Sequence, residues 1–256
     1  MTADLLSLFR QWRVWFLMAH QDIRLRYQRS ILGPFWIGLS LGALVLGIGY
    51  LYAEIFETDW ADYCFFLAAG LIAWTFISGT ISDAASVVME EAGHLRSVSL
   101  PLPLLAGRVV YRNLIVLGHN LVVGVIVVYV TGHVLKAELL MIVPGIALLC
   151  LFGLAAALFI APFCARYRDL PELIRNLMLM LFFLTPILWP ESEAGRRTQF
   201  VDGNPFNSLV NLVRDPLMGE AIAGRDWAVA AGTTAVLFVA ALLSLSYARH
   251  RVLNWL

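Results

Sequence analysis

Residues 139–165 read LLMIVPGIALLCLFGLAAALFIAPFCA, a stretch of 27 residues without a single Asp, Glu, Lys or Arg. The hydrocarbon core of a bilayer is about 30 Å thick, and a helix crosses it with roughly 20 apolar residues. Because lipid offers the backbone no hydrogen-bond partner, a segment of this composition is stable there only as a helix. The stretch therefore predicts a transmembrane helix.

Four further stretches of 20 or more residues also contain no Asp, Glu, Lys or Arg, and a sixth stretch without these residues is shorter. The chain has 256 residues, of which 60% are hydrophobic, and its mean hydropathy is +0.78. This composition excludes an ordinary soluble domain. We predict an all-α, polytopic membrane protein with about six transmembrane helices. The other stretches are 33–53, 63–82, 113–135 and 227–248, with the shorter one at 176–190.

The distribution of basic residues predicts the orientation. Threading six spans from a cytoplasmic amino terminus places 13 of the 18 Lys and Arg residues in cytoplasmic segments. Cytoplasmic loops carry an excess of Lys and Arg, so both termini are expected inside. The longest apolar stretch before residue 33 is too short for a signal peptide, which predicts an uncleaved terminus. The expected parts are a cytoplasmic amphipathic region at 1–32, a transmembrane domain at 33–248 and a cytoplasmic tail at 249–256.

Three segments outside the spans have helical patterns. Apolar residues between Leu5 and Ile23 recur near one face of a helix, which predicts an interface helix or, alternatively, a helix buried against other protein. A charged helix is expected to continue past the second span to about Ser99, before Pro101 and Pro103. Asn204 followed by a proline predicts a short outer helix, re-entrant or interfacial, before the last span.

The sequence also indicates which chemistry the chain lacks. A phosphate loop requires Gly-Lys-Ser/Thr, yet the one lysine, Lys136, follows Leu135. ATP is therefore expected to be hydrolysed by another subunit, and this chain is not expected to be an enzyme or to hold a metal or cofactor. The net charge of zero and the absence of a basic patch argue against a nucleic-acid partner. For His119-Asn120 we favour an interhelical hydrogen bond over a proton relay.

Five short motifs follow one another along nearly the whole chain. They are DIRLRYQRSILGPFWI at 22–37, LP at 100–101, RYRD at 166–169, NPF at 204–206 and RDPL at 214–217. In this order they resemble the membrane subunits of type 2 ABC exporters that move polysaccharides, above all the O-antigen lipopolysaccharide exporter permeases.

The resemblance implies a homodimer in the bacterial cytoplasmic (inner) membrane, bound to two copies of an ATPase that uses ATP and magnesium. It implies a lipid-linked polysaccharide as substrate. It also implies a coupling segment at about 85–105 that contacts the ATPase and an outer gate segment at about 191–226. The residues expected for coupling are Glu90, Glu91, His94, Arg96 and Ser97, and those for the gate are Phe206, Leu209 and Val213.

Two further sets of residues suit such a substrate. Guanidinium groups pair with phosphate, so a lipid-linked pyrophosphate is expected at Arg24, Arg26, Tyr27 and Arg29, unless these arginines serve only membrane orientation. Aromatic rings stack on sugar faces without trapping the polymer, unless they face lipid. The rings expected along the translocation path are Phe35, Trp36, Tyr50, Tyr52, Trp74 and Phe76.

Other functions remain as alternatives at this point. A capsular polysaccharide or teichoic acid exporter permease would have the same architecture. An ion-coupled flippase would usually have an ionisable residue inside a span, and a membrane-bound glycan-processing enzyme would need clustered carboxylates, whereas the six stretches contain no carboxylate and no arginine. The sequence leaves open whether 191–226 forms one helix or two.

Overall fold

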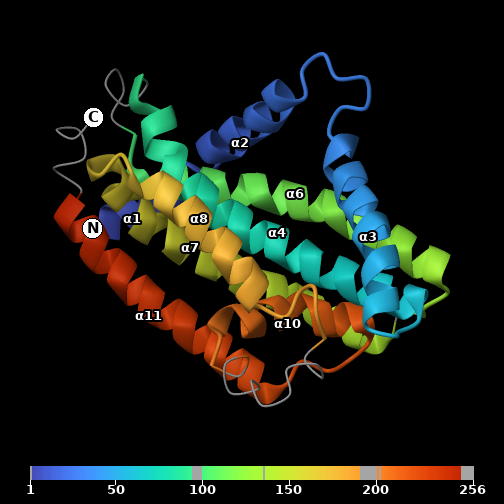
Figure 1. Cartoon of the computed structure of the whole chain (residues 1–256). Coiled ribbons are helices and arrows are strands. Elements are labelled where there is room, and N and C mark those ends of the chain that lie inside the picture. Colours follow the sequence, from blue (N-terminus) through green and yellow to red (C-terminus); the bar gives the residue numbers. More distant parts are fainter. Residues whose placement is uncertain (1, 94–99, 135, 191–200, 202, 249–256) are drawn as a thin grey trace.

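The structure is a computed structural model that describes residues 2–93, 100–134, 136–190, 201 and 203–248. Within these residues the fold is entirely helical, as predicted (Figure 1). The elements are α1 (Thr2–Arg10), α2 (Trp12–Arg26), α3 (Phe35–Ile55), α4 (Trp60–Glu90), α6 (Leu102–Thr131), the 3-10 helix η1 (Ala137–Met141), α7 (Ile142–Arg166), α8 (Leu170–Leu184), α10 (Pro205–Met218) and α11 (Gly224–Ala248).

Five helical segments in the described part of the chain are long and apolar enough to cross a bilayer. They are α3, α4, α6, η1 continued by α7, and α11. The five spans together with α8 alternate in direction, so α1 and the end of α11 lie at the same end of the bundle (Figure 1). We call this end, where α4 ends and α6 begins, the α2 end, and the opposite end the α10 end. The prediction of a polytopic membrane protein is confirmed.

The sixth pass combines a short helix with an irregular segment. The charge-free stretch 176–190 was expected to be the helix, but α8 occupies 170–184 and begins before Arg175. Its 15 residues cover about 22 Å, which is less than the hydrocarbon thickness. Residues 185–188 continue the pass as buried, non-helical chain. The charge-free stretch begins later than the helix because Glu172 and Arg175 lie inside the helix, and it runs past the helix because the non-helical chain from Thr185 onward is also free of charge.

Two polar side chains from other helices satisfy this irregular segment. The hydroxyl of Tyr63 donates to the carbonyl of Leu188, and Nη1 of Arg214 donates to the carbonyl of Pro186 at 2.6 Å. Non-helical backbone at membrane depth is tolerated only where protein surrounds it and supplies such partners. These contacts explain how the chain after a helix of only 15 residues can continue as non-helical backbone to the α10 end.

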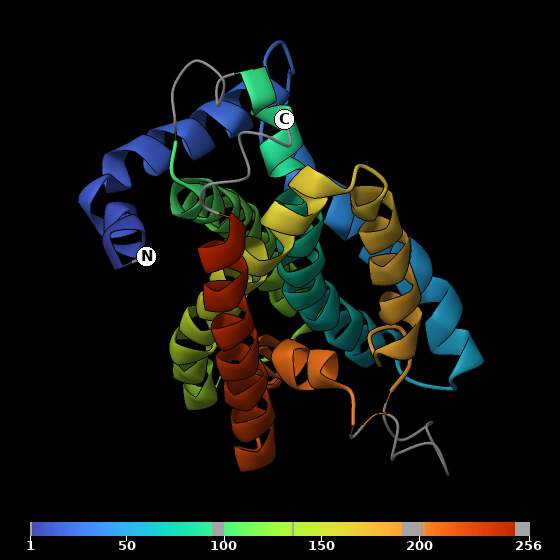
Figure 2. The same ribbon diagram turned by 90° about the vertical axis from the view of Figure 1, so that its left-hand side faces the viewer.

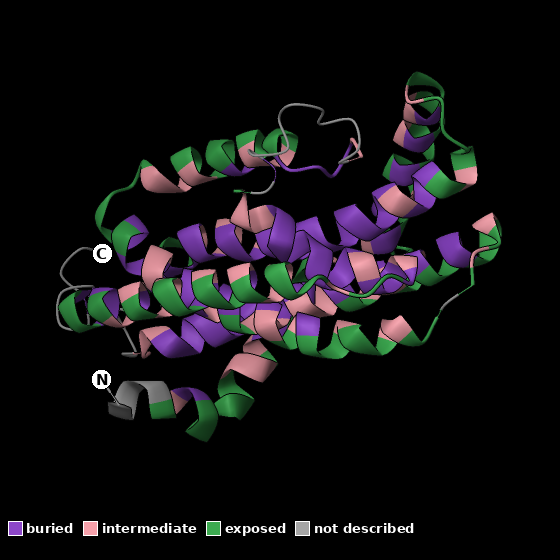
Figure 3. Cartoon of the chain, turned by 90° about the horizontal axis from the view of Figure 1, so that it is seen from below, coloured by how far each residue is buried: buried purple, intermediate pink, exposed green. Residues whose placement is uncertain are grey.

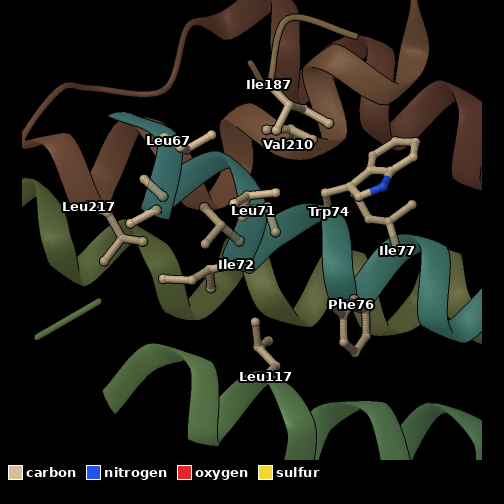
Figure 4. Close-up of a cluster of buried hydrophobic side chains, with 14 of the residues drawn as sticks. Leu67, Leu71, Ile72, Trp74, Phe76, Ile77, Leu117, Ile187, Val210 and Leu217 are labelled. Atoms are coloured by element: carbon tan, nitrogen blue, oxygen red, sulfur yellow. The ribbon is translucent and has the colours of Figure 1, made fainter. Parts of the chain in front are cut away.

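Helix α4 is the centre of the bundle. It packs against α3, α6, α7, α8 and α10. In its most apolar stretch of 18 residues, 78% of the residues are buried, compared with 22% in the corresponding stretch of α3. Burial is concentrated along the middle of the bundle, whereas the outer helices are largely exposed (Figure 3). Side chains from α6, α10 and the irregular segment after α8 meet α4 in the core (Figure 4), where Leu67, Ile72, Phe76, Leu117, Ile187 and Val210 pack together.

A glycine sets the distance between α7 and α10. A Cβ atom added at Gly145 would lie 2.4 Å from the carbonyl oxygen of Leu212 and 3.2 Å from its carbon. A contact with backbone cannot be relieved by a rotamer change, so the first turn of α7 requires glycine here. Small residues allow such close helix approach inside membranes.

The amino-terminal region forms two helices instead of one. The chain bends at Gln11 between α1 and α2, and α2 packs along α6 through Ala19 and Ile23, which are 0% and 7% exposed. The rings of Trp15 and Phe16 lie 5.5 Å and 5.0 Å from that of Tyr111 on α6. Part of the amphipathic face predicted from sequence is thus buried against this chain's own third span, whereas Phe9 and Trp12 of the same face are 74% and 48% exposed.

Candidate functional site

A buried cluster of charges joins three helices at the α2 end. Arg108 on α6 donates from Nε to Oδ2 of Asp22 at 2.7 Å and from Nη2 to Oδ1 at 2.6 Å. Its Nη1 lies 2.6 Å from Oε1 of Glu91, which follows α4. A guanidinium is planar and presents its donors as a fork, so Arg108 grips one carboxylate in bidentate fashion while it pairs with a second.

The cluster extends one helical turn along α6. Arg112 lies 3.3 Å from Asp22 and 2.8 Å from Asp83 on α4, and Asn113 donates to the same oxygen of Asp83 at 2.8 Å. Arg108 and Arg112 are four residues apart, so they project from one face of α6. Both guanidiniums therefore reach Asp22, and each pairs with one further carboxylate, Glu91 for Arg108 and Asp83 for Arg112.

Burial makes this cluster energetically important. The side chains of Arg108, Arg112, Asp22 and Glu91 are 9%, 7%, 15% and 11% exposed. Charges removed from water are tolerated only when they are paired, and losing one partner of a buried pair is strongly destabilising. We did not predict this cluster, because Asp22 lies 86 and 90 residues away from the two arginines that it joins. The feature of the sequence that could have indicated the cluster is the pair Arg108 and Arg112, spaced i, i+4 immediately before an apolar stretch.

The structure separates the two glutamates predicted for coupling. Glu90 is exposed at the end of α4 and accepts a hydrogen bond from Ser86 at 2.6 Å. Glu91 is 8% exposed and faces Arg108. His94, Arg96 and Ser97 lie outside the described residues. Helix α4 ends at Glu90, and Pro101 caps the start of α6, so the prolines begin the next helix.

A groove of about 1200 Å³ lies between α2 and α6. It brings Arg24 and Tyr27 together, whereas Arg26 and Arg29, also predicted for phosphate binding, are exposed residues that do not line it. His119 lines the groove from α6. The full lining is Leu17, His20, Gln21, Ile23, Arg24, Leu25, Tyr27, Gln28, Pro34, Ile115 and His119.

The six predicted path aromatics fall into two groups. Phe35, Trp36 and Tyr50 on α3 are 74%, 46% and 69% exposed, and Tyr52 is partly buried beside Tyr63. In contrast, Trp74 and Phe76 on α4 are 6% and 0% exposed, and both belong to the hydrophobic core. Rings of the first group are accessible in this conformation, and rings of the second are packed inside the subunit.

Helix α10 meets the core through aromatic rings. The ring of Phe206 lies 6.1 Å from that of Trp74 on α4 and 6.5 Å from that of Phe152 on α7. The other two residues predicted for the outer gate, Leu209 and Val213, are completely buried. Helix α10 is thus embedded between other helices at its end of the bundle, which differs from a helix lying flat in the interface.

Polar side chains fix α10 to the beginning of α11. Ser208 and Asn211 donate to the two carboxylate oxygens of Asp226 at 2.6 Å and 3.0 Å. Arg214 donates to the side-chain oxygen of Asn211 at 2.6 Å, and its guanidinium lies 5.0 Å from the ring centre of Phe66. Each of these polar groups on α10 therefore has a partner despite its burial.

The polar pair of the third span has two different environments. Asn120 donates to the hydroxyl of Thr75 on α4 at 3.0 Å, which is the interhelical hydrogen bond favoured from the sequence. His119 bonds to the carbonyl of Ile115 in its own helix at 2.8 Å. In the part of the chain that the structure covers, no group of three or more His, Cys, Asp or Glu side chains is arranged to hold a metal ion.

The fold and site define a polytopic membrane protein with a charged junction at one end and a buried short helix at the other. The chain belongs to the ABC-2 type transporter family, whose model matches residues 13–218. It is a membrane permease subunit, not itself an ATPase.

Three curated proteins that are similar to this chain have the same name. An O-antigen export system permease protein RfbA of Myxococcus xanthus is 26% identical over 200 residues, with 75% of each chain covered. Two proteins of the same name from Klebsiella pneumoniae are 19% and 17% identical over 212 residues, with 80% of each chain covered.

Proposed function

We propose that this chain is the membrane subunit of an ABC exporter that moves a lipid-linked, O-antigen-like polysaccharide across the bacterial cytoplasmic membrane. The names of the three relatives support the substrate class. The geometric observation that carries the proposal is the groove between α2 and α6, with Arg24 and Tyr27 in its wall. A groove of this volume, basic and partly aromatic, suits the pyrophosphate and first sugar of a lipid-linked glycan.

The energy source in this proposal is a separate ATPase, of which two copies bind a homodimer of this chain. The α2 end faces the cytoplasm, because segments at this end hold most of the arginines. The exposed Glu90 and the segment that follows α4 contact the ATPase. ATP and magnesium belong to that partner.

The buried charge cluster gives this coupling a mechanical basis. Asp22 holds α2 to Arg108 and Arg112, while Glu91 and Asp83 hold the end of α4 to the same two arginines. A displacement of the α4 end by the ATPase is therefore transmitted to α2, which forms one wall of the groove. Nucleotide-driven motion and the entrance of the polymer are linked through one set of ion pairs.

The test is reconstitution with the partner ATPase. The complex is purified in detergent, placed in proteoliposomes, and assayed for ATP hydrolysis and glycan transport with and without lipid-linked glycan. We expect the glycan to stimulate hydrolysis, and we expect Arg24→Gln with Tyr27→Phe to weaken that stimulation. Arg13→Gln is the matched control, since Arg13 is exposed on the same helix and does not line the groove.

Two results would contradict the proposal. Transport that stops when the proton gradient collapses, while ATP remains, would indicate an ion-coupled flippase. Purification of the chain without any bound ATPase would remove the energy source that the proposal requires. Stimulation by a capsular or teichoic acid precursor in place of an O-antigen-like one would keep the permease and replace its substrate.

A further inference from the structure

A second, almost entirely apolar groove lies on a different face of the bundle. Helices α8 and α11 stand apart there, with α10 crossing between them at one end (Figure 2). The groove has a volume of about 670 Å³, and α7 and α4 form its floor. Among its lining residues are Phe152, Phe159, Met178, Leu181, Phe206 and Val236.

The groove leads to a basic hollow at the α2 end. The residues Phe152, Phe159, Phe163 and Arg166 follow one stripe of α7 at helical spacing; the first two line the groove and the last two line the hollow. On α11 the lining passes from Ala240 in the groove to Ser244 and Tyr247 in the hollow. The two depressions therefore follow each other along the same pair of helices.

The hollow offers donors for an anion. Nη1 of Arg166 donates to the hydroxyl of Tyr247 at 3.0 Å, and the guanidinium lies 5.2 Å from the ring centre of Tyr167. Arg168 follows in the connection to α8, where Arg175 pairs with Glu172 at 3.0 Å. From Arg166 to Arg175 the chain has three arginines against Asp169 and Glu172, which leaves an excess of positive charge.

We propose that this groove and hollow bind an anionic glycerophospholipid of the same leaflet, as a resident lipid distinct from the transported polymer. The acyl chain lies in the groove and the phosphate lies at Arg166. The distance from Phe152 to Arg166 along α7 is about 21 Å, enough for half of a 30 Å hydrocarbon core plus the headgroup level. A glycan is excluded from the groove, because its hydroxyls would lose their hydrogen bonds among these apolar side chains.

A bound lipid would complete the packing of α8. This helix rests on α4 and only lightly on α7, and the groove separates it from α11. An acyl chain filling the groove would support α8 on the side where the described helices leave the groove open. The inference does not depend on which polymer is exported.

The experiment is native mass spectrometry of the full chain with its ATPase, from nanodiscs that hold equal amounts of phosphatidylglycerol and phosphatidylcholine. One arginine near a membrane surface is worth about fivefold in affinity for an anionic lipid. We expect the wild type to retain phosphatidylglycerol preferentially, and Arg166→Gln to lower that preference by about fivefold. Arg166→Lys should largely keep it, and Arg13→Gln, at an exposed residue of α2 outside the hollow, should not change it.

A second variant tests the groove independently of charge. A Cβ at Gly232 would have no atom within 4 Å, so Gly232→Phe can fold with its ring in the groove. It should reduce retention of both lipids, whereas Val239→Phe, on an exposed position of α11 that does not line the groove, should not. Equal retention of the two lipids by the wild type, or retention unaffected by Gly232→Phe, would overturn the proposal. Displacement of phosphatidylglycerol by polyprenyl phosphate would also overturn it, because the groove would then hold the substrate's lipid.

Discussion

The charge cluster at the α2 end makes a quantitative prediction about two of its members. Arg108→Gln removes the cation that pairs with both Asp22 and Glu91 and leaves one arginine in the cluster beside three carboxylates, and breaking a buried pair in this way costs about 3–5 kcal/mol. Asp22→Asn leaves two carboxylates with two arginines. It therefore costs only the lost charged hydrogen bonds, about 1–3 kcal/mol. The arginine variant should be the less stable one, although each substitution removes one charge.

The double variant measures the coupling directly. Because Asp22 and Arg108 share two hydrogen bonds, the cost of removing both should be smaller than the sum of the single costs by about 0.5–3 kcal/mol. The assay is unfolding in mixed detergent micelles with increasing dodecyl sulfate. The matched control is the pair Glu172 and Arg175, whose side chains are each 66% exposed and whose coupling should lie within about 0–1 kcal/mol.

Two outcomes would refute this reasoning. If Asp22→Asn destabilises the protein as much as Arg108→Gln, then charge balance within the cluster does not control stability. If the two costs are simply additive, then the bidentate contact between α2 and α6 contributes no coupling energy. In either case the cluster could not transmit motion from α4 to α2 in the way proposed.

Three further predictions concern other parts of the bundle. Gly145→Ala should lower the free energy of unfolding by about 1–3 kcal/mol, since its Cβ meets a backbone carbonyl of α10, whereas Gly118→Ala, at an open position of α6, should raise it by up to about 1 kcal/mol. Arg214→Met should cost about 1–3 kcal/mol for each buried acceptor left without its donor, seen in the same unfolding assay and as faster proteolysis after α8. Glu90→Arg should reduce glycan-stimulated ATP hydrolysis without loss of stability, because Glu90 is exposed. Glu91→Gln should instead lower the stability of the protein, because Glu91 pairs with Arg108. Unfolding midpoints and hydrolysis rates measured on the same samples distinguish these two effects.

The order of the spans was predictable because partition into a bilayer depends on the composition of each segment. Five charge-free stretches became five spanning helices, and the largest shifts of their boundaries lie where helix continues into charged sequence, as at Glu90. The short helix before the last span was also predictable. Asn204 caps it through its side chain, and Gly219 ends it with a positive φ of 73°.

The candidate site was predictable only in part. Arg24 and Tyr27 were predicted together with Arg26 and Arg29 because guanidinium groups pair with phosphate, but which of the four line the groove depends on how α6 packs beside them. Trp74 and Phe76 were expected beside the polymer because aromatic residues in an apolar stretch look alike whichever way they point. Their burial depends on where α6, α7 and α8 pack around α4.

The sequence by itself thus determined the membrane environment, the number and order of the passes, the short α10 and the family. These features follow from the free energy of transferring each segment into lipid and from local capping, neither of which needs a distant partner. Only the tertiary structure decided that Asp22, Glu91 and Arg108 form one buried cluster, and that Tyr63 and Arg214 complete the short sixth pass. A buried charge or an open backbone carbonyl is tolerated only next to its partner, and here each partner comes from a helix far away in the sequence.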